Sequence, residues 1–122
     1  MSINVSIVLY NNIYEEVEKA VLSCLKSSLI SKIYIIDNSP EDSLKKLTRL
    51  SEKIFYNFNG ANLGFGRAHN IALRKSIEEK VKYHLILNPD VYFYEGVLEE
   101  LYCVMENNPD VGLIAPKVLY PN

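Results

Sequence analysis

Short apolar runs alternate along the chain with longer segments in which apolar residues recur every three or four positions. Short runs bounded by turn-forming residues are typical of buried strands, and the longer segments have the period of amphipathic helices. The chain therefore predicts five strands that alternate with four helices. The strand runs cover residues 3–10, 32–36, 53–58, a stretch that starts at residue 83 and breaks at Asn88-Pro89, and residues 111–115.

Helix boundaries can be predicted from capping residues and from acidic residues near the start. The first helix opens at Glu15, and the second has Ser39 as its N-cap with Pro40 in its first turn. The third is expected over residues 67–80 and the fourth over residues 95–107. The side chains expected to face the core are Val17, Val21, Cys24 and Leu25, then Leu44, Leu47 and Leu50, then Ala68, Ile71, Ala72 and Ile77, and finally Val97, Leu98, Leu101 and Met105.

This alternation predicts an α/β fold: a Rossmann-like, mostly parallel sheet with helices on both faces. The strand that starts at residue 83 is expected to be buried on both faces, because its first residues are almost all apolar. With 122 residues, the chain is expected to form one domain.

Composition excludes several classes of function. A formal net charge of -2 argues against a nucleic-acid-binding protein, and no apolar run is long enough to span a membrane. The start of the chain shows no signal peptide, so a location in the cytoplasm is expected, either free or at the inner face of the membrane. Cys24 and Cys103 lack metal-site spacing and are expected to be buried free thiols.

Polar turns follow four of the predicted strands, over residues 10–12, 37–39, 59–66 and 88–90. In an open α/β sheet, ligands bind in the crevice outside the carboxyl ends of the strands. Asp90 could hold a cation there, and a cation could hold a phosphate. The alternative is that these loops are polar because they lie on the surface.

The turn with Gly60, Gly64 and Gly66 does not match the dinucleotide fingerprint, because the third glycine would fall at His69. It could admit a ligand close to the backbone, or it could simply make a turn. Arg67 and His69 lie where a basic side chain opposes the helix dipole, a cost that a bound anion would offset. His69 is otherwise expected on the helix surface, and His84 is expected to be structural.

Five motifs occur in an order that resembles the family 2 glycosyltransferases with a GT-A fold, closest to their rhamnosyltransferase-like branch. The resemblance covers essentially the whole chain. The motifs are Val5-Ser6-Ile7-Val8-Leu9-Tyr10-Asn11, Ile36-Asp37-Asn38-Ser39, Asn62-Leu63-Gly64-Phe65-Gly66 with Asn70, Leu87-Asn88-Pro89-Asp90, and Gly112-Leu113-Ile114-Ala115-Pro116-Lys117.

The resemblance implies transfer of a sugar, with inversion, from a dTDP- or UDP-linked donor to a glycan or lipid-linked acceptor, in surface polysaccharide synthesis. It assigns the nucleotide to Tyr10, Asn11, Asp37, Asn38, Asn62, Gly64 and Asn88. Asp90 matches the last carboxylate of the DxD-like motif, which holds Mg²⁺ or Mn²⁺ against the diphosphate. Asn88 replaces the first acid of that motif, so the metal would depend mainly on Asp90.

Residues 1–122 are expected to be the nucleotide-sugar-binding part of a GT-A domain truncated at its C-terminus, because residues 117–120 look like the start of a further element. The family's catalytic base would follow later, so no catalytic residue is assigned. Two other functions remain open: a non-catalytic nucleotide-binding module or truncated transferase, and a receiver-like signalling domain. The fragment could also form a homodimer through an open sheet edge or through the apolar residues 118–120.

Overall fold

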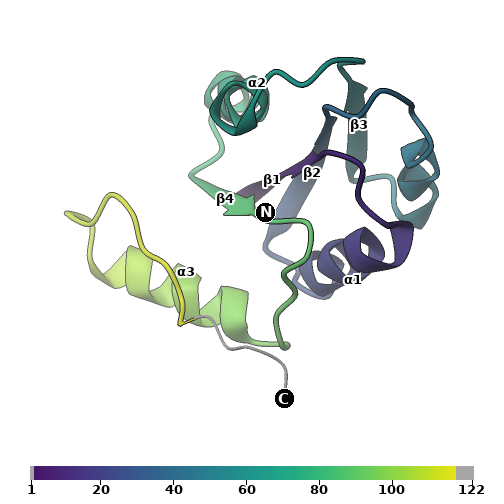
Figure 1. Cartoon of the computed structure of the whole chain (residues 1–122). Helices are drawn as coiled ribbons and strands as arrows, with labels where there is room; N and C mark the ends of the chain where they lie inside the picture. The colour runs from purple at the N-terminus through teal and green to yellow at the C-terminus, as the bar shows by residue number, and fades with distance from the viewer. Residues whose placement is uncertain (1, 118–122) are drawn as a thin grey trace.

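A four-stranded, all-parallel sheet forms the centre of the structure, a computed structural model that describes residues 2–117 (Figure 1). The order of the strands across the sheet is β3-β2-β1-β4. This arrangement confirms the predicted α/β fold with a parallel sheet. The strands are β1 (Ile3–Leu9), β2 (Ile30–Asp37), β3 (Ile54–Phe58) and β4 (Tyr83–Leu87).

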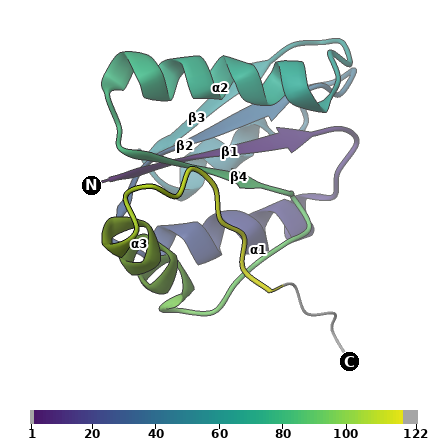
Figure 2. The same cartoon turned by 90° about the vertical axis from the view of Figure 1, so that its left-hand side faces the viewer.

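Helices cover both faces of the sheet, with α2 on one side and α1 and α3 on the other (Figure 2). Right-handed crossovers account for this division, because the chain moves outward from β1 to β3 and then returns across the sheet to β4. None of the helices within residues 2–117 could cross a membrane. The helices are α1 (Tyr14–Leu25), the 3₁₀ helix η1 (Lys45–Leu50), α2 (Phe65–Glu79) and α3 (Val97–Asn107).

The alternation of side chains along β1 separates two cores. Ile3, Val5, Ile7 and Leu9 are buried in the larger core, which also contains the apolar stripe of α1, the two buried leucines around η1 and Leu98 of α3. On the opposite face, the alanines of α2 pack on Tyr34 and Ile36 of β2 in a smaller cluster. Successive residues of a strand point to opposite faces, so a single strand supplies both environments.

Between α2 and the sheet lies a row of buried and half-buried polar side chains. Ser6 Oγ lies 2.7 Å from Nδ1 of His69 and 2.8 Å from Nε2 of His84, and Ser76 Oγ lies 2.7 Å from Nδ1 of His84. Burial lowers the pKa of His69, and burial together with the neighbouring His69 lowers the pKa of His84 to about 4. Both imidazoles are therefore neutral near pH 7, and His69 is buried instead of lying on the helix surface as expected.

The row continues to Asn4, whose amide donates to Ser76 Oγ and to Oε1 of Glu79. Tyr34 and Lys32 of β2 donate to Oε2 of the same carboxylate. Burial raises the pKa of Glu79, but the hydrogen bonds from Tyr34, Lys32 and Asn4 outweigh burial and lower it to about 2. These contacts connect the last turn of α2 to Asn4 of β1 and to Lys32 and Tyr34 of β2.

The predicted second helix is wrong in type and position: a short 3₁₀ helix begins at Lys45 instead of an α-helix at Pro40. Ser39 cannot cap a helix here, because its backbone N–H donates to Oδ1 of Asp37 and its hydroxyl oxygen accepts from the backbone N–H of Asn11. The other predicted helices are present, within two residues of the expected starts.

Residues 111–115 form no strand, so the predicted fifth strand is wrong within the part of the chain that the structure describes. This segment follows α3 and turns back along it without pairing with the sheet (Figures 1 and 2). With no further strand on its outer side among residues 2–117, β4 is an edge strand. Ile86 is 46% exposed, so the expectation that this strand is buried on both faces is also wrong. The expected continuation over residues 117–120 falls largely outside the described residues.

Two expectations about side-chain burial also fail. Ile77 is 75% exposed because the face of α2 that packs on the sheet carries the small residues Ala68, Ala72 and Ser76. Cys103 lies on the exposed side of α3, whereas Cys24 is buried in α1 and its pKa is raised by burial to about 12.

Candidate functional site

The carboxyl ends of all four strands meet at one edge of the sheet, which we call the rim and define by the segments 10–12, 37–39, 59–64 and 88–90. The strand order reverses between the neighbouring strands β1 and β4, because the chain moves outward from β1 to β3 and then crosses back to β4. Such a reversal is the usual position of a ligand crevice in an open α/β sheet. All predicted site residues lie in the four segments of the rim.

Asp37, the last residue of β2, is the most buried acid at the rim, with 1% of its surface exposed. Its Oδ1 accepts from the backbone N–H of Ser39, and its Oδ2 accepts from the hydroxyl of Tyr56 at 2.5 Å. Burial, followed by this hydrogen bond and the charge of Asp37, raises the pKa of Tyr56. Both carboxylate oxygens are thus engaged, and Asp37 fixes the turn after β2 to β3.

Asn38 joins this turn to the glycine-containing loop before α2. Its Oδ1 accepts from the amide of Asn59 at 2.8 Å, while its own amide points to Oδ1 of Asn62 at 3.4 Å and to the carbonyl of Gly64 at 3.3 Å. Gly64 has a φ of 84°, a conformation that side-chain-bearing residues rarely adopt, and its N–H donates to Asn62. The loop is therefore held in one shape by amide contacts.

Tyr10 and Asn11 leave β1 at the centre of the rim. Asn11 has a φ of 53°, which asparagine tolerates better than most residues, and its N–H donates to Ser39 Oγ at 2.8 Å. Its side chain is exposed, and the side chain of Tyr10 is 54% exposed. The backbone of this turn is fixed while two polar side chains remain open to a ligand.

Asn88 and Asp90 follow β4, next to the end of β1. Since Leu87 pairs with Ile7, residues 88–90 continue at the level of the last residues of β1. Both side chains are exposed, and the carbonyl of Asn88 accepts from the N–H of Val91 in a tight turn. Among residues 2–117, the side chains of Asn88 and Asp90 form no hydrogen bond with the network around Asp37.

The residues at this position fit a hard cation that is shared with a ligand. Mg²⁺ prefers oxygen and is commonly held by one or two carboxylates together with substrate phosphates. Asp90 supplies one exposed carboxylate, and Asn88 supplies an amide oxygen nearby in sequence. Within residues 2–117 there is no cluster of three or more His, Cys, Asp or Glu side chains that would bind a metal without such a ligand.

The structure thus joins Asn11, Asp37, Asn38, Asn62 and Gly64 in one hydrogen-bonded network. Asn59 links its two halves, because its backbone N–H donates to the carbonyl of Asp37 and its side-chain amide donates to Asn38. Sequence reasoning missed three members of it, Ser39 as an acceptor, Tyr56 and Asn59. Asn59 lay within a predicted rim turn, and its polar character was the available signal. Tyr56 lay inside a predicted strand, where nothing distinguished its hydroxyl from that of a surface tyrosine.

Comparison with known proteins gives a consistent result. The sequence profile of glycosyl transferase family 2 matches residues 5–121. The low-salt glycan biosynthesis hexosyltransferase Agl10 of Haloferax volcanii is 27% identical over 117 residues, which are 95% of this chain and 37% of the relative.

Solved structures show the same fold. Residues 1–349 of TarS from S. aureus superpose with a TM-score of 0.72 at 18% identity, over 89% of this chain and 33% of that one. The same protein in complex with UDP gives a TM-score of 0.73 at 17% identity, with the same coverage. The chain thus spans about a third of the length of these relatives.

Proposed function

The chain belongs to glycosyl transferase family 2, and on this premise we propose that it is the part of a GT-A domain that binds a nucleotide-diphosphate sugar. The observation that carries the proposal is the hydrogen-bonded network at the rim, which links the ends of β1, β2 and β3 with the loop before α2. A network of this kind holds a binding surface ready before the ligand arrives, which lowers the entropic cost of binding.

The rim residues divide into two groups by exposure. Asp37 and Asn38 are buried and engaged by their neighbours, so their contribution is to position the turns that carry the other groups. Tyr10, Asn11 and Asn62 are exposed and are the side chains we assign to direct contact with the nucleotide. Gly64 has open space where a Cβ would lie, which allows a ligand to approach its backbone closely.

Asp90 is assigned to Mg²⁺ or Mn²⁺, with Asn88 beside it. A divalent cation at this position would neutralise charge on the diphosphate as it leaves the sugar. The chain's own contribution is the single exposed carboxylate at the end of β4. We assign no residue within 1–122 as the base that would deprotonate the acceptor.

For the whole enzyme, we propose inverting transfer from a dTDP- or UDP-linked sugar to a glycan or lipid-linked acceptor in surface polysaccharide synthesis, in the rhamnosyltransferase-like branch. This rests on the sequence motifs and on family membership. The second candidate is a module that binds nucleotide without catalysis. It is favoured by the single exposed carboxylate, Asp90, at the end of β4, where Asn88 stands in place of a second acid and residues 2–117 contain no cluster of three metal-binding side chains.

Separate measurement of donor binding and donor cleavage distinguishes these two functions. We expect UDP or dTDP to bind the purified chain, and the corresponding nucleotide-sugar to be cleaved slowly or not at all. If the chain is part of an enzyme, a longer protein that contains it together with the rest of the domain should transfer sugar faster than the chain alone. A module without catalysis should show no such increase. A chain that binds neither nucleotide, at any concentration of Mg²⁺ or Mn²⁺, would contradict the proposal.

A further inference from the structure

A surface hollow of about 200 Å³ lies beside α2, away from the row of histidines and serines. It is lined by Leu63, Arg67, Asn70, Ile71 and Arg74. A single ordered water needs only about 10–15 Å³, and typical small-molecule pockets occupy about 300–1,000 Å³. The hollow is therefore large enough for a charged group of a ligand but smaller than the pockets that enclose whole ligands.

The hollow is separate from the rim residues assigned to the nucleotide. His69 and Ser76 lie on the side of α2 that contacts β1 and β4, whereas Ile71 packs against the cluster with Tyr34 and Ile36 of β2. The hollow is on this second side. It meets the rim only at Leu63, between Asn62 and Gly64.

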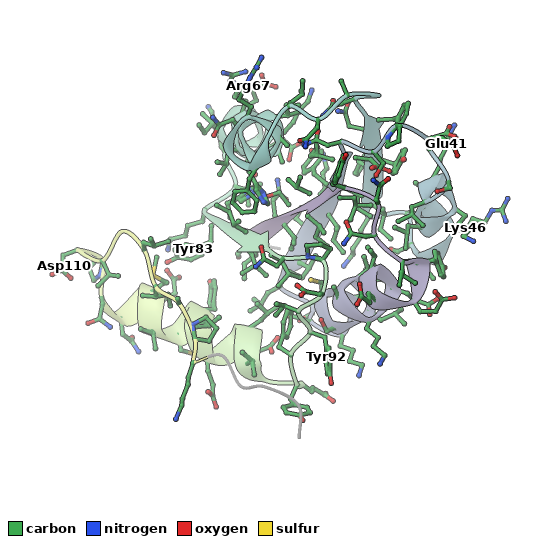
Figure 3. All side chains as sticks on the ribbon, viewed as in Figure 1. Glu41, Lys46, Arg67, Tyr83, Tyr92 and Asp110 are labelled. Carbon is green, nitrogen blue, oxygen red and sulfur yellow. The ribbon has the colours of Figure 1, made fainter. Side chains whose placement is uncertain are left out.

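Two guanidinium groups line the hollow, and neither forms an ion pair within the described residues 2–117. Arg67 and Arg74 are seven residues apart, which places them on one face of the helix about 10 Å from each other along its axis. Among residues 2–117, the ion pairs are Lys32–Glu79 and Lys82–Glu106, so neither arginine has a carboxylate within 4.0 Å. Figure 3 shows Arg67 projecting from α2 away from the sheet.

The position of Arg67 also favours an anion. It lies in the first turn of α2, which contains no acidic residue, so its charge adds to the positive end of the helix dipole. A positive charge at this end of a helix is unfavourable, and a bound anion would offset it. Glu78, one turn after Arg74, is the nearest acid along this side of the helix but forms no ion pair with it in the described part of the chain.

We propose that this hollow binds a phosphate-bearing ligand. The planar forks of Arg67 and Arg74 suit phosphate oxygens, because each guanidinium can donate two parallel hydrogen bonds. Asn70, between them, adds a neutral amide donor, and Leu63 and Ile71 form an apolar wall. The phosphate could belong to a free metabolite or to a lipid headgroup, since both present the same group to the arginines.

Titration of inorganic pyrophosphate into the intact chain tests the proposal, in the presence of saturating UDP so that the rim does not contribute. We expect Arg67→Gln and Arg74→Gln each to weaken binding about tenfold or more, since each removes a charge-assisted contact. Arg67→Lys should restore only part of the affinity. Lys75→Gln is the matched control, because it removes the same charge from an exposed position of α2 outside the hollow.

A second arm identifies the source of the phosphate. Co-sedimentation with phosphatidylcholine vesicles, with and without phosphatidic acid, will show arginine-dependent retention if the ligand is a lipid headgroup. Arginine-dependent pyrophosphate binding without retention indicates a soluble ligand. The proposal is overturned if neither probe binds, or if Lys75→Gln weakens binding as much as the arginine variants do. Failure of UDP to bind would contradict the rim assignment and leave this test intact.

Discussion

At the scale of single residues, the most buried polar groups of the rim organise other groups instead of facing a ligand. Asp37 is 1% exposed and Asn38 2% exposed, and each is engaged by partners from β3 or the following loop. A buried carboxylate is stable only when its oxygens are hydrogen-bonded. The contacts of Asp37 should therefore be important for stability as well as for the shape of the rim.

Tyr56→Phe removes the hydroxyl that donates to Oδ2 of Asp37 and changes little else. We expect the free energy of unfolding to fall by about 1.5–3 kcal/mol, the usual range for a hydrogen bond to a charged group. Urea denaturation measures this difference. Tyr10→Phe is the control, because Tyr10 is 54% exposed and its loss should cost less than about 0.5 kcal/mol. Equal effects of the two variants would show that the Asp37 contact is unimportant.

His84 should make stability depend on pH. In the unfolded chain its pKa is about 6.5, whereas in the folded protein burial and the neighbouring His69 lower the pKa to about 4. The unfolded state then binds more protons between these values, so the free energy of unfolding falls as the pH drops from about 6.5 to about 4. Below about pH 4.5, protonation of Glu79 weakens its hydrogen bonds and lowers the free energy of unfolding further, because the pKa of Glu79 is about 2 in the folded protein and 4.5 in the unfolded chain.

The measurement is the urea midpoint across this pH range for the wild type and His84→Gln. We expect the stability of the wild type to fall steadily as the pH drops from about 6.5 to about 4.5, and that of His84→Gln to fall less steeply, with the remaining slope due to His69. A slope that is the same in both proteins would mean that His84 is not the group that titrates.

At this scale, the sequence predicted which residues lie at the rim but not which of them are exposed. Asp37 and Asn62 both follow strands as polar residues of turns, yet one is buried and the other exposed. The difference comes from Tyr56, whose hydroxyl reaches Asp37 from a strand that pairs with β2. A contact between side chains on separate strands depends on register, which the pattern of apolar residues does not specify.

At the scale of elements, α2 shows that small residues can define the buried face of a helix. Ala68, Ala72 and Ser76 allow a close approach to a sheet face that is itself polar at Asn4 and Ser6. The sequence correctly predicted Ala68 and Ala72 on this face, but it chose the large apolar Ile77 in place of the small polar Ser76. The available signal was the coincidence of a small-residue stripe with polar residues at every second position of β1.

The end of α2 offers a direct test of its backbone conformation. Lys80 has a φ of 57°, and the N–H of Val81 donates to the carbonyl of Ser76, as in a Schellman-type helix end. Lys80→Gly should therefore stabilise the protein by about 0.5–1 kcal/mol, because glycine adopts this conformation without strain. Lys75→Gly, in the helix interior, should destabilise it by about 1 kcal/mol. Thermal unfolding compares the two, and a loss of stability in Lys80→Gly would contradict the assigned helix end.

The two elements predicted wrongly have a common cause, since each depended on a partner that local sequence cannot supply. Ser39 was a suitable N-cap, but its N–H and hydroxyl are already used by Asp37 and Asn11. Residues 111–115 had a strand-like pattern, but in the structure they do not meet the edge of β4. The other helices and strands have strong apolar patterns of their own, and they were predicted with nearly correct boundaries even where the partner is distant in sequence, as for β4 beside β1.

At the scale of the whole molecule, the outer edge of β4 is open in the described part of the chain. Ile86, a residue of this strand, is 46% exposed. An open edge presents unpaired backbone groups that can pair with another strand. We therefore predict self-association at high concentration through this edge. The other route expected from the sequence, through residues 118–120, lies outside the described residues.

Ile86→Lys should shift the protein towards the monomer in sedimentation velocity, because a lysine on an edge strand opposes pairing with a second copy. Ile77→Lys is the control, because Ile77 is 75% exposed on α2. A wild type that remains monomeric at high concentration, or two variants that associate equally, would contradict this prediction.

The central claim is that the rim binds a nucleotide diphosphate with the help of a cation on Asp90. Calorimetric titration of UDP with and without Mn²⁺ tests it most directly, on the wild type, Asp90→Asn and the matched control Asp110→Asn, which changes an exposed acid after α3. We predict Mn²⁺-dependent binding in the wild type and in Asp110→Asn, and a loss of the Mn²⁺ dependence in Asp90→Asn. Binding that depends on Mn²⁺ equally in all three proteins would contradict the assignment of Asp90, and no binding in any of them would contradict the rim as a nucleotide site.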